Sequence, residues 1–125
     1  MSDPTATFFG ELGRRGHERV LEAVTGTIRF DLESDHRTDC WFLAIRQGDV
    51  EIFREQRPAD AVVRANRPLF DRVASGEASA FTAWIRNELS IEGDLGLARL
   101  FQRILPGPPG AHHPRTLAGA ARRQS

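Results

Sequence analysis

The stretch Leu89-Ser90-Ile91-Glu92-Gly93-Asp94-Leu95-Gly96-Leu97-Ala98 carries three structural signals in succession. Apolar and polar side chains alternate from Leu89 to Ile91, which is typical of a half-buried strand. Gly93-Asp94 follows, and Asp is a favourable N-cap for a helix. Apolar residues then recur at helical spacing as far as Leu105. The stretch therefore predicts a strand, a tight turn and a final helix.

Two short helices are predicted immediately before this stretch. The first begins behind Asn66, a favourable N-cap, has Pro68 in its first turn, and ends at Ser75-Gly76. The second covers residues 78–85 and carries the large apolar side chains Phe81, Trp84 and Ile85. Because both helices separate the last strand from the strand before it, they permit a crossover connection and a mixed sheet.

Four strands are predicted nearer the N-terminus. In each of them apolar side chains alternate with polar ones or occupy both faces. The turn Gln47-Gly48-Asp49 predicts a hairpin between the second and third strands, and the polar residues 33–39 predict a loop after the first. The four strands are expected at residues 28–32, 41–45, 50–53 and 61–64.

A helix over residues 6–24 is predicted ahead of these strands, because Phe8, Phe9 and Leu12 begin a helical apolar pattern. Thr25-Gly26 is expected to end it. The predicted fold class is α+β: a mixed five-stranded sheet covered by helices on one side.

Composition narrows the function classes. The chain has 125 residues, and its 17 basic residues balance 17 acidic ones, so no basic excess points to a nucleic-acid partner. All the basic residues are Arg, and the absence of Lys excludes a Schiff-base or P-loop lysine mechanism. A single cysteine, Cys40, fits a reducing compartment, and the first residues, which lack a basic region followed by an apolar run, predict no secretory signal. We therefore expect a cytoplasmic protein.

The composition changes sharply at Pro106-Gly107-Pro108-Pro109-Gly110. The residues beyond it have no apolar periodicity and no acidic side chain, and such a segment cannot bury enough surface to offset its ordering entropy. The sequence therefore predicts one folded domain over residues 1–105 and a disordered tail over residues 106–125.

Four short motifs in this order resemble the sterol carrier protein (sterol transfer) family, here as a stand-alone domain. The resemblance covers about residues 8–105, and its most specific part is the strand, glycine turn and helix of residues 89–98. The other three motifs are Thr25-Gly26-Thr27-Ile28-Arg29-Phe30-Asp31-Leu32, Trp41-Phe42-Leu43-Ala44-Ile45 with Gly48-Asp49-Val50, and Ala59-Asp60-Ala61-Val62-Val63 with the helix end Ala74-Ser75-Gly76-Glu77.

The resemblance implies an apolar tunnel between sheet and helices that holds a fatty acyl chain, a sterol or a similar lipid, for transfer or presentation. It implies no catalysis, no cofactor and no metal, and a transient membrane or protein contact as a further partner. The apolar side chains expected to line the tunnel are Trp41, Leu43, Phe70, Val73, Phe81, Trp84, Ile85, Leu97, Leu100, Phe101 and Ile104.

Two departures from the family pattern bear on the ligand. Asn87 stands where the family has a glycine before its final strand, and Asn tolerates the left-handed conformation better than other non-Gly residues. Trp84 is bulky for its position and could narrow or fill the tunnel. A protein-interaction or accessory module with the same fold and a filled tunnel is therefore the alternative interpretation.

Few polar residues suggest catalysis. His17 falls at an interior helical spacing and predicts a packed or half-exposed histidine. Asp35-His36 with Asp39 is weak as a metal site, because one His and two carboxylates lie on a predicted loop. Cys40 at a strand start is expected to be buried and inert. An enzyme is thus the least favoured of the three interpretations.

Three other polar side chains have expected roles. Asp60 precedes a strand of Ala and Val, and we expect it to pair with an arginine or to accept hydrogen bonds from backbone amides. Arg99 and Arg103 lie on the solvent side of the final helix and are candidates for contact with a lipid head group. That helix itself could act as a lid over the tunnel or dock on a membrane.

Overall fold

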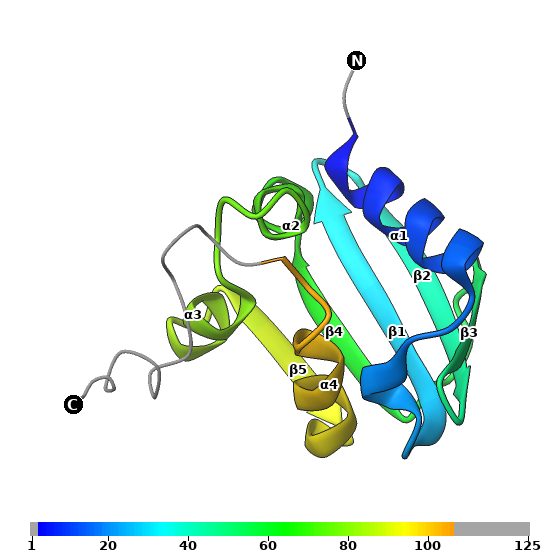
Figure 1. Ribbon diagram of the computed structural model, residues 1–125. Helices are drawn as coiled ribbons and strands as arrows, with labels where there is room; N and C mark the ends of the chain where they lie inside the picture. The colour runs from blue at the N-terminus through cyan, green and yellow to red at the C-terminus, as the bar shows by residue number, and fades with distance from the viewer. Residues whose placement is uncertain (1–2, 107–125) are drawn as a thin grey trace.

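A single mixed sheet with helices on one of its faces makes up the chain in the computed structural model, which describes residues 3–106 (Figure 1). The predicted fold class is confirmed. The elements follow one another as α1 (Pro4–Arg15), a 3-10 turn η1 (Arg19–Leu21), β1 (Thr25–Ser34), β2 (Arg37–Arg46), β3 (Asp49–Phe53), β4 (Ala61–Asn66), α2 (Arg67–Ala74), α3 (Ala80–Ile85), β5 (Leu89–Gly93) and α4 (Leu95–Gln102). The predicted disordered tail lies, apart from Pro106, outside the described residues.

The strand order is β3-β2-β1-β4-β5, and only β1 and β4 run parallel among the described strands. The parallel pair arises because residues 54–60 carry the chain from β3 across to β4. This segment crosses the face opposite the helices, where the Arg57 guanidinium lies 4.7 Å from the ring centroids of both Phe42 and Phe53. A crossover through the two helices before the last strand was predicted to permit the mixed sheet. That prediction is wrong, because β4 and β5 are antiparallel neighbours.

Residues 33–39 were predicted to form a loop, and that prediction is wrong. The β1–β2 ladder continues to the pair Ser34 and Arg37, so that only Asp35 and His36 lie in the turn. Asp35 takes the left-handed conformation (φ 45°) that a tight hairpin turn needs. Backbone hydrogen bonds extend the two strands beyond the apolar core. The side chains there are polar, most of them exposed and Asp39 buried in ion pairs, so no apolar alternation marks the strands.

The predicted helix over residues 6–24 is too long at its C-terminal end. Gly16 takes a left-handed conformation (φ 71°) and donates its N–H to Leu12 O, which ends α1 at Arg15. His17 then forms an isolated β-bridge with Asp49 on β3. The helix also begins earlier than predicted, because Asp3 caps it and accepts from the Ala6 amide at 3.1 Å.

The turns around β5 and α4 agree with the sequence. Asp94 caps α4 by accepting from the Leu97 amide at 3.0 Å, and Asn87 takes the left-handed conformation (φ 62°). Gly93 has φ 91°, and a Cβ atom there would come within 2.2 Å of the Asp60 carbonyl oxygen. Only glycine therefore permits this close approach of β5 to the start of β4. Asn66 likewise caps α2 through the Leu69 amide at 2.8 Å.

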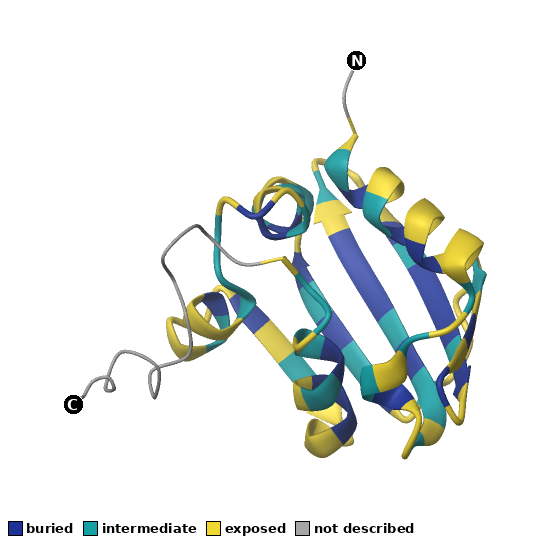
Figure 2. Cartoon of the chain, in the orientation of Figure 1, coloured by how far each residue is buried: buried dark blue, intermediate teal, exposed yellow. Residues whose placement is uncertain are grey.

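The core lies between the sheet and the helices, and Figure 2 shows the buried residues concentrated there. On β1, Ile28, Phe30 and Leu32 face the helices and are at most 2% exposed. On the opposite face, Phe42 is covered by the 54–60 segment. The Asp60 side chain joins that segment to β1 by accepting from the Thr27 amide at 2.9 Å, which confirms its expected role.

Candidate functional site: an apolar cavity under α3 and α4

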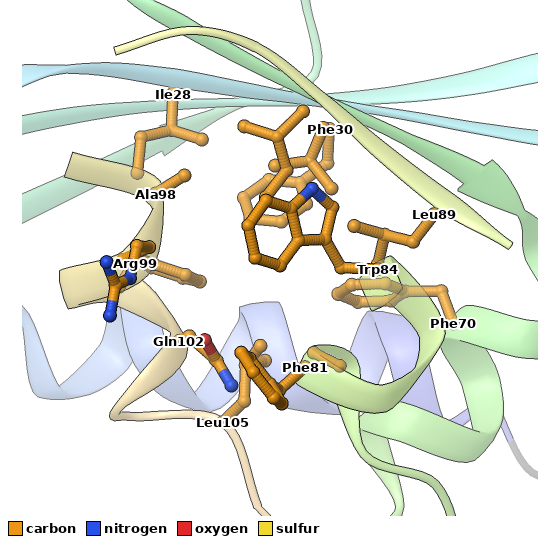
Figure 3. A pocket seen from close by; sticks show the side chains of 14 residues that line it. Ile28, Phe30, Phe70, Phe81, Trp84, Leu89, Ala98, Arg99, Gln102 and Leu105 are labelled. Carbon is orange, nitrogen blue, oxygen red and sulfur yellow. The ribbon is translucent and has the colours of Figure 1, made fainter. Parts of the chain in front are cut away.

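A small cavity of about 30 Å³ lies between the sheet and helices α3 and α4 (Figure 3). A single water needs roughly 10–15 Å³, so the space has room for about two or three water molecules. Side chains from the sheet form its floor, and side chains from the three C-terminal helices form its walls. The lining residues are Ile28, Phe30, Val63, Phe70, Ala80, Phe81, Trp84, Leu89, Ile91, Ala98, Arg99, Phe101, Gln102 and Leu105.

Trp84 occupies the centre of this site. In Figure 3 its indole extends from α3 across the space in front of the sheet side chains. The Phe81 ring lies one turn earlier on the helix, with the two ring centroids 6.0 Å apart and the planes tilted by 57°. Trp84 is half-buried, and Phe81 is 41% exposed. Both rings therefore border solvent as well as the cavity, and they reduce the space beneath α3.

Two polar side chains, Arg99 and Gln102, stand among the lining residues, one turn apart on α4. Figure 3 shows the Arg99 guanidinium turned away from the Trp84 ring, toward the edge of the site. Most arginines of the described chain form an ion pair with an acid, but Arg99 has no carboxylate within 4.0 Å among residues 3–106. The cavity is thus apolar inside and positively charged at its rim.

The predicted lining residues fall into two groups. Phe70, Phe81, Trp84 and Phe101 do lie on the cavity wall. The others lie elsewhere: in the closed core (Trp41, Leu43, Val73 and Leu97), partly buried against it (Leu100 and Ile104), or 60% exposed to solvent (Ile85).

Sequence reasoning missed several wall residues. Ile28 and Phe30 lie on the same face of the sheet as Trp41 and Leu43. The alternation of apolar residues therefore predicted the correct face of the sheet, but it did not predict which strand lines the cavity. Leu89 and Ile91 on β5 carried the same alternation signal. No pattern in the sequence separates residues that line a space from residues that fill it.

The other half of the helical layer is filled by aromatic rings. Phe9 of α1 lies at the centre of this cluster, with ring centroids 5.1 Å from Phe30, 5.1 Å from Trp41 and 5.9 Å from Phe70. These four side chains are at most 3% exposed. A tunnel that ran the length of the sheet would meet these buried, packed rings between α1 and the strands.

Polar contacts at the same end tie α1 to α2 and to the sheet. The Arg67 guanidinium contacts the carboxylates of Asp3 (2.6 Å), Asp71 (3.4 Å) and Asp39. We call these four residues the Arg67 clasp. Burial opposes charge on Asp39, but the hydrogen bond from Arg37 and the nearby arginine charges outweigh it and lower the pKa of this carboxyl. The α1 end of the helical layer is therefore stabilised both by aromatic packing and by ion pairs.

Two residues considered for catalysis, Cys40 and His17, contact carboxylates. Burial, followed by the Asp31 hydrogen bond, raises the pKa of the Cys40 thiol to about 11, so the thiol stays protonated. His17 lies between two carboxylates, with Nε2 at 2.7 Å from Glu22 and Nδ1 at 2.6 Å from Asp49. Within residues 3–106 no group of three His, Cys, Asp or Glu side chains is arranged to hold a metal ion.

Helix length bears on membrane insertion. Among residues 3–106 no helix is both long enough and apolar enough to span a bilayer.

Comparison with known proteins agrees with this fold. A model of the SCP-2 sterol transfer family matches residues 9–106. The structure is similar to sterol carrier protein 2 from Yarrowia lipolytica in its apo form (TM-score 0.65, 17% identity, covering 83% of this chain and 91% of that one). It is also similar to palmitated SCP2L2 from Aedes aegypti (TM-score 0.62, 14% identity, 78% and 90% covered).

The family match covers most of the chain, so the chain belongs to the SCP-2 sterol transfer family, a class of domains that binds or transfers lipids. A curated relative, hydroxysteroid dehydrogenase-like protein 2 of Xenopus laevis, is 26% identical over 106 residues. The match covers 83% of this chain and 25% of that protein. The chain therefore spans about a quarter of the length of this relative.

Proposed function

We propose that the chain binds a single-chain lipid, such as a fatty acid, without chemical change, and carries or presents it. The observation that supports this most is the cavity under α3 and α4, whose interior wall is apolar and whose rim carries Arg99 and Gln102. Each methylene removed from water contributes about 0.8 kcal/mol. Several methylenes would therefore supply useful affinity without any specific polar contact.

Binding requires the cavity to expand, since about 30 Å³ does not accommodate an acyl chain. Trp84 and Phe81 are the side chains that can yield, because both already border solvent and α3 packs mainly against β5. Outward rotation of these two rings would extend the cavity along the underside of α3. The palmitated Aedes aegypti protein, which has a similar fold, supports an acyl chain as the ligand.

Arg99 and Gln102 provide the polar end of the proposed site. A guanidinium without an acidic partner attracts a carboxylate or a phosphate, and a neighbouring amide can donate a further hydrogen bond. With its tail under Trp84, a fatty acid would place its carboxylate at this rim. The site therefore favours an anionic head group over a neutral one.

The alternative function, an accessory module with a filled tunnel, also has an observation in its favour. Trp84 and the aromatic cluster leave only a small space under α3 and α4. In the Xenopus relative the matching region is a quarter of a longer protein, which is the setting in which a module would support a neighbouring domain. This alternative predicts no uptake of lipid.

Uptake of a fluorescent fatty acid, together with mass spectrometry of solvent extracts from the purified protein, tests the proposal. We expect about one ligand per chain and displacement of the probe by palmitate. Trp84→Ala removes the obstructing ring and should strengthen binding, whereas Leu43→Ala, in the closed core, should not. An empty extract and no uptake at saturating probe would support the accessory module.

A further inference from the structure

We propose that the outer edge of β5 is an interaction surface for a second copy of the chain, whose own β5 adds to it in antiparallel orientation. The strands β3 and β5 are the two outer strands of the sheet, and Figure 1 shows them on opposite sides. An outer strand presents backbone N–H and C=O groups that pair readily with another strand. The two edges differ in whether the described chain covers them.

Residues 16–18 cover the edge of β3. The Val50 amide donates to the Gly16 carbonyl at 3.0 Å, and the Glu18 amide donates to the Gly48 carbonyl at 2.8 Å. A further strand would pair with β3 only by displacing this segment.

The edge of β5 has no such cover within residues 3–106. The Asp94 amide donates to the Asp60 carbonyl at 2.8 Å, and hydrogen-bonded pairs alternate along an antiparallel ladder. Every second residue back from Asp94 therefore directs its backbone groups at β4, whereas Leu89 and Ile91 direct theirs away from the sheet. Within the described range no hydrogen bond from outside the sheet reaches these two residues. The strand also has no proline and no basic side chain, which are common protections of an outer strand.

The side chains of β5 suit pairing with an identical strand. When a two-fold axis passes beside Ile91, Ser90 of one copy lies opposite Glu92 of the other. This is a non-hydrogen-bonded pair, in which side chains approach most closely, and the serine hydroxyl can donate to the carboxylate. With the axis at Glu92 two carboxylates would face each other, and with the axis at Ser90 Glu92 would face Glu88. The register centred on Ile91 is therefore favoured over both neighbouring registers.

The large exposed apolar side chains lie at the two ends of this strand. Within residues 3–106 they are Phe81 (41% exposed) and Ile85 (60%) on α3, directly before β5, and Leu95 (39%) at the start of α4, directly after it. Antiparallel pairing places the start of one strand beside the end of the other. It therefore brings α3 of one copy to the start of α4 of the second, on the same face of the joined sheet, where Ile85 and Leu95 can bury each other.

The charges at the strand ends are mixed. Glu88 and Asp94 lie just outside the strand and come opposite each other in this register. Arg86 lies 3.8 Å from Glu88 and supplies a compensating positive charge at that point. A five-residue edge is also small beside the roughly 800 Å² per partner of a standard interface, so we expect a reversible dimer with a dissociation constant in the micromolar range. This inference goes beyond the proposed function and does not depend on ligand binding.

Analytical ultracentrifugation of the full chain over a range of concentrations tests the proposal. We expect a monomer–dimer equilibrium that Ser90→Glu weakens by about three- to tenfold, because the new carboxylate meets Glu92 at two symmetry-related positions. Adding Glu92→Arg to Ser90→Glu should restore the dimer, since unlike charges then face each other and Arg64 keeps an acid opposite it in the ladder. Gln47→Glu is the matched control, because it adds the same charge at an exposed position beside the other edge and should dimerise as the wild type does.

Amide hydrogen exchange locates the contact. The amides of Leu89 and Ile91 should become more protected as the protein concentration rises. The proposal would be overturned by a monomer at concentrations up to about 1 mM, by Ser90→Glu dimerising as the wild type does, or by a double variant as weak as Ser90→Glu. Protection of these amides that did not change with concentration would assign the edge to residues 107–125 of the same chain, and would also overturn it.

Discussion

The two ends of the helical layer are packed very differently. Under α1, Phe9 packs against three aromatic rings with centroids 5.1–5.9 Å away, and the Arg67 clasp holds the helix to α2 and the sheet. Under α3 and α4, Trp84 is only half-buried beside a small cavity, and Arg99 has no acid near it within the described residues. We infer that the α1 end maintains the fold, while the α3 end can rearrange at lower cost and accept a ligand.

The largest expected effect is a difference in unfolding free energy between a substitution at the α1 end and one at the α3 end. Phe9→Ala should lower the free energy of unfolding by about 3–5 kcal/mol, the cost of emptying a fully buried aromatic site. Trp84→Ala should cost clearly less, since its ring is partly exposed and its removal enlarges a space that already exists. Urea unfolding followed by circular dichroism measures both. Equal losses would contradict the division into a tightly packed end and a looser end.

Acid should weaken the α1 end. The pKa of Asp39 is lowered from 3.8, because its arginine contacts outweigh the effect of burial. The carboxylate therefore stabilises the fold at pH values above its unfolded pKa, and this contribution is lost as the pH falls through the lower, folded pKa. Melting temperatures between pH 7 and pH 2.5 should show this decline.

Asp39→Asn should be less stable than the wild type at neutral pH and should change less in acid. Glu51→Gln, an exposed acid on β3, serves as control and should follow the wild type throughout. If Asp39→Asn and the wild type shared one pH profile, the clasp would not contribute to the stability of the α1 end.

A smaller effect concerns the head group at the α3 end. Arg99→Gln should weaken binding of a fluorescent fatty acid by about three- to tenfold, the loss of one charge-assisted contact at an exposed rim. Binding of the matching fatty alcohol should be unchanged. Arg103→Gln removes another exposed arginine that does not line the cavity, and it should affect neither ligand. Equal losses for acid and alcohol would place the head group elsewhere.

The smallest expected effect is at His17, where α1 meets β3. Hydrogen bonds to Glu22 and then Asp49 raise the pKa of this imidazole. Its charged form therefore stabilises the fold below the unfolded pKa of 6.5, and this contribution is lost as the pH rises through the higher, folded pKa. A slight fall in melting temperature above neutral pH should disappear in His17→Gln. A fall of the same size in the variant would assign it to another group.

Local signals explain what the sequence predicted correctly. The caps at Asn66 and Asp94 depend on a few neighbouring residues, so their positions follow directly from residue type. The end of α1 combines a local cap, the left-handed Gly16, with a distant contact, because the Gly16 carbonyl accepts from the Val50 amide at 3.0 Å. A helical pattern that continued through Gly16 could not reveal this pairing with β3.

The lining of the cavity, like the end of α1, depends on contacts between residues far apart in the sequence. Trp41 and Trp84 are equally apolar, and the sequence assigns both to a tunnel wall. In the structure Phe9, which is distant in sequence, stacks on Trp41 with the ring centroids 5.1 Å apart, whereas among residues 3–106 Phe81 is the one aromatic ring paired with Trp84. Which apolar side chains line a space is therefore decided by long-range packing that residue patterns do not encode.

The central claim is that a ligand enters the α3 end of the helical layer and not the α1 end. The chain has two tryptophans, Trp41 at the α1 end and Trp84 at the α3 end, and no tyrosine to add emission, so tryptophan fluorescence tests this claim most directly. Trp41→Phe leaves Trp84 as the reporter, and Trp84→Phe leaves Trp41. A brominated fatty acid quenches a tryptophan that it contacts, and the unbrominated acid is the control. We expect strong quenching of Trp84 and little quenching of Trp41. Quenching of Trp41 equal to or greater than that of Trp84 would show that the ligand enters the α1 end and would contradict the account.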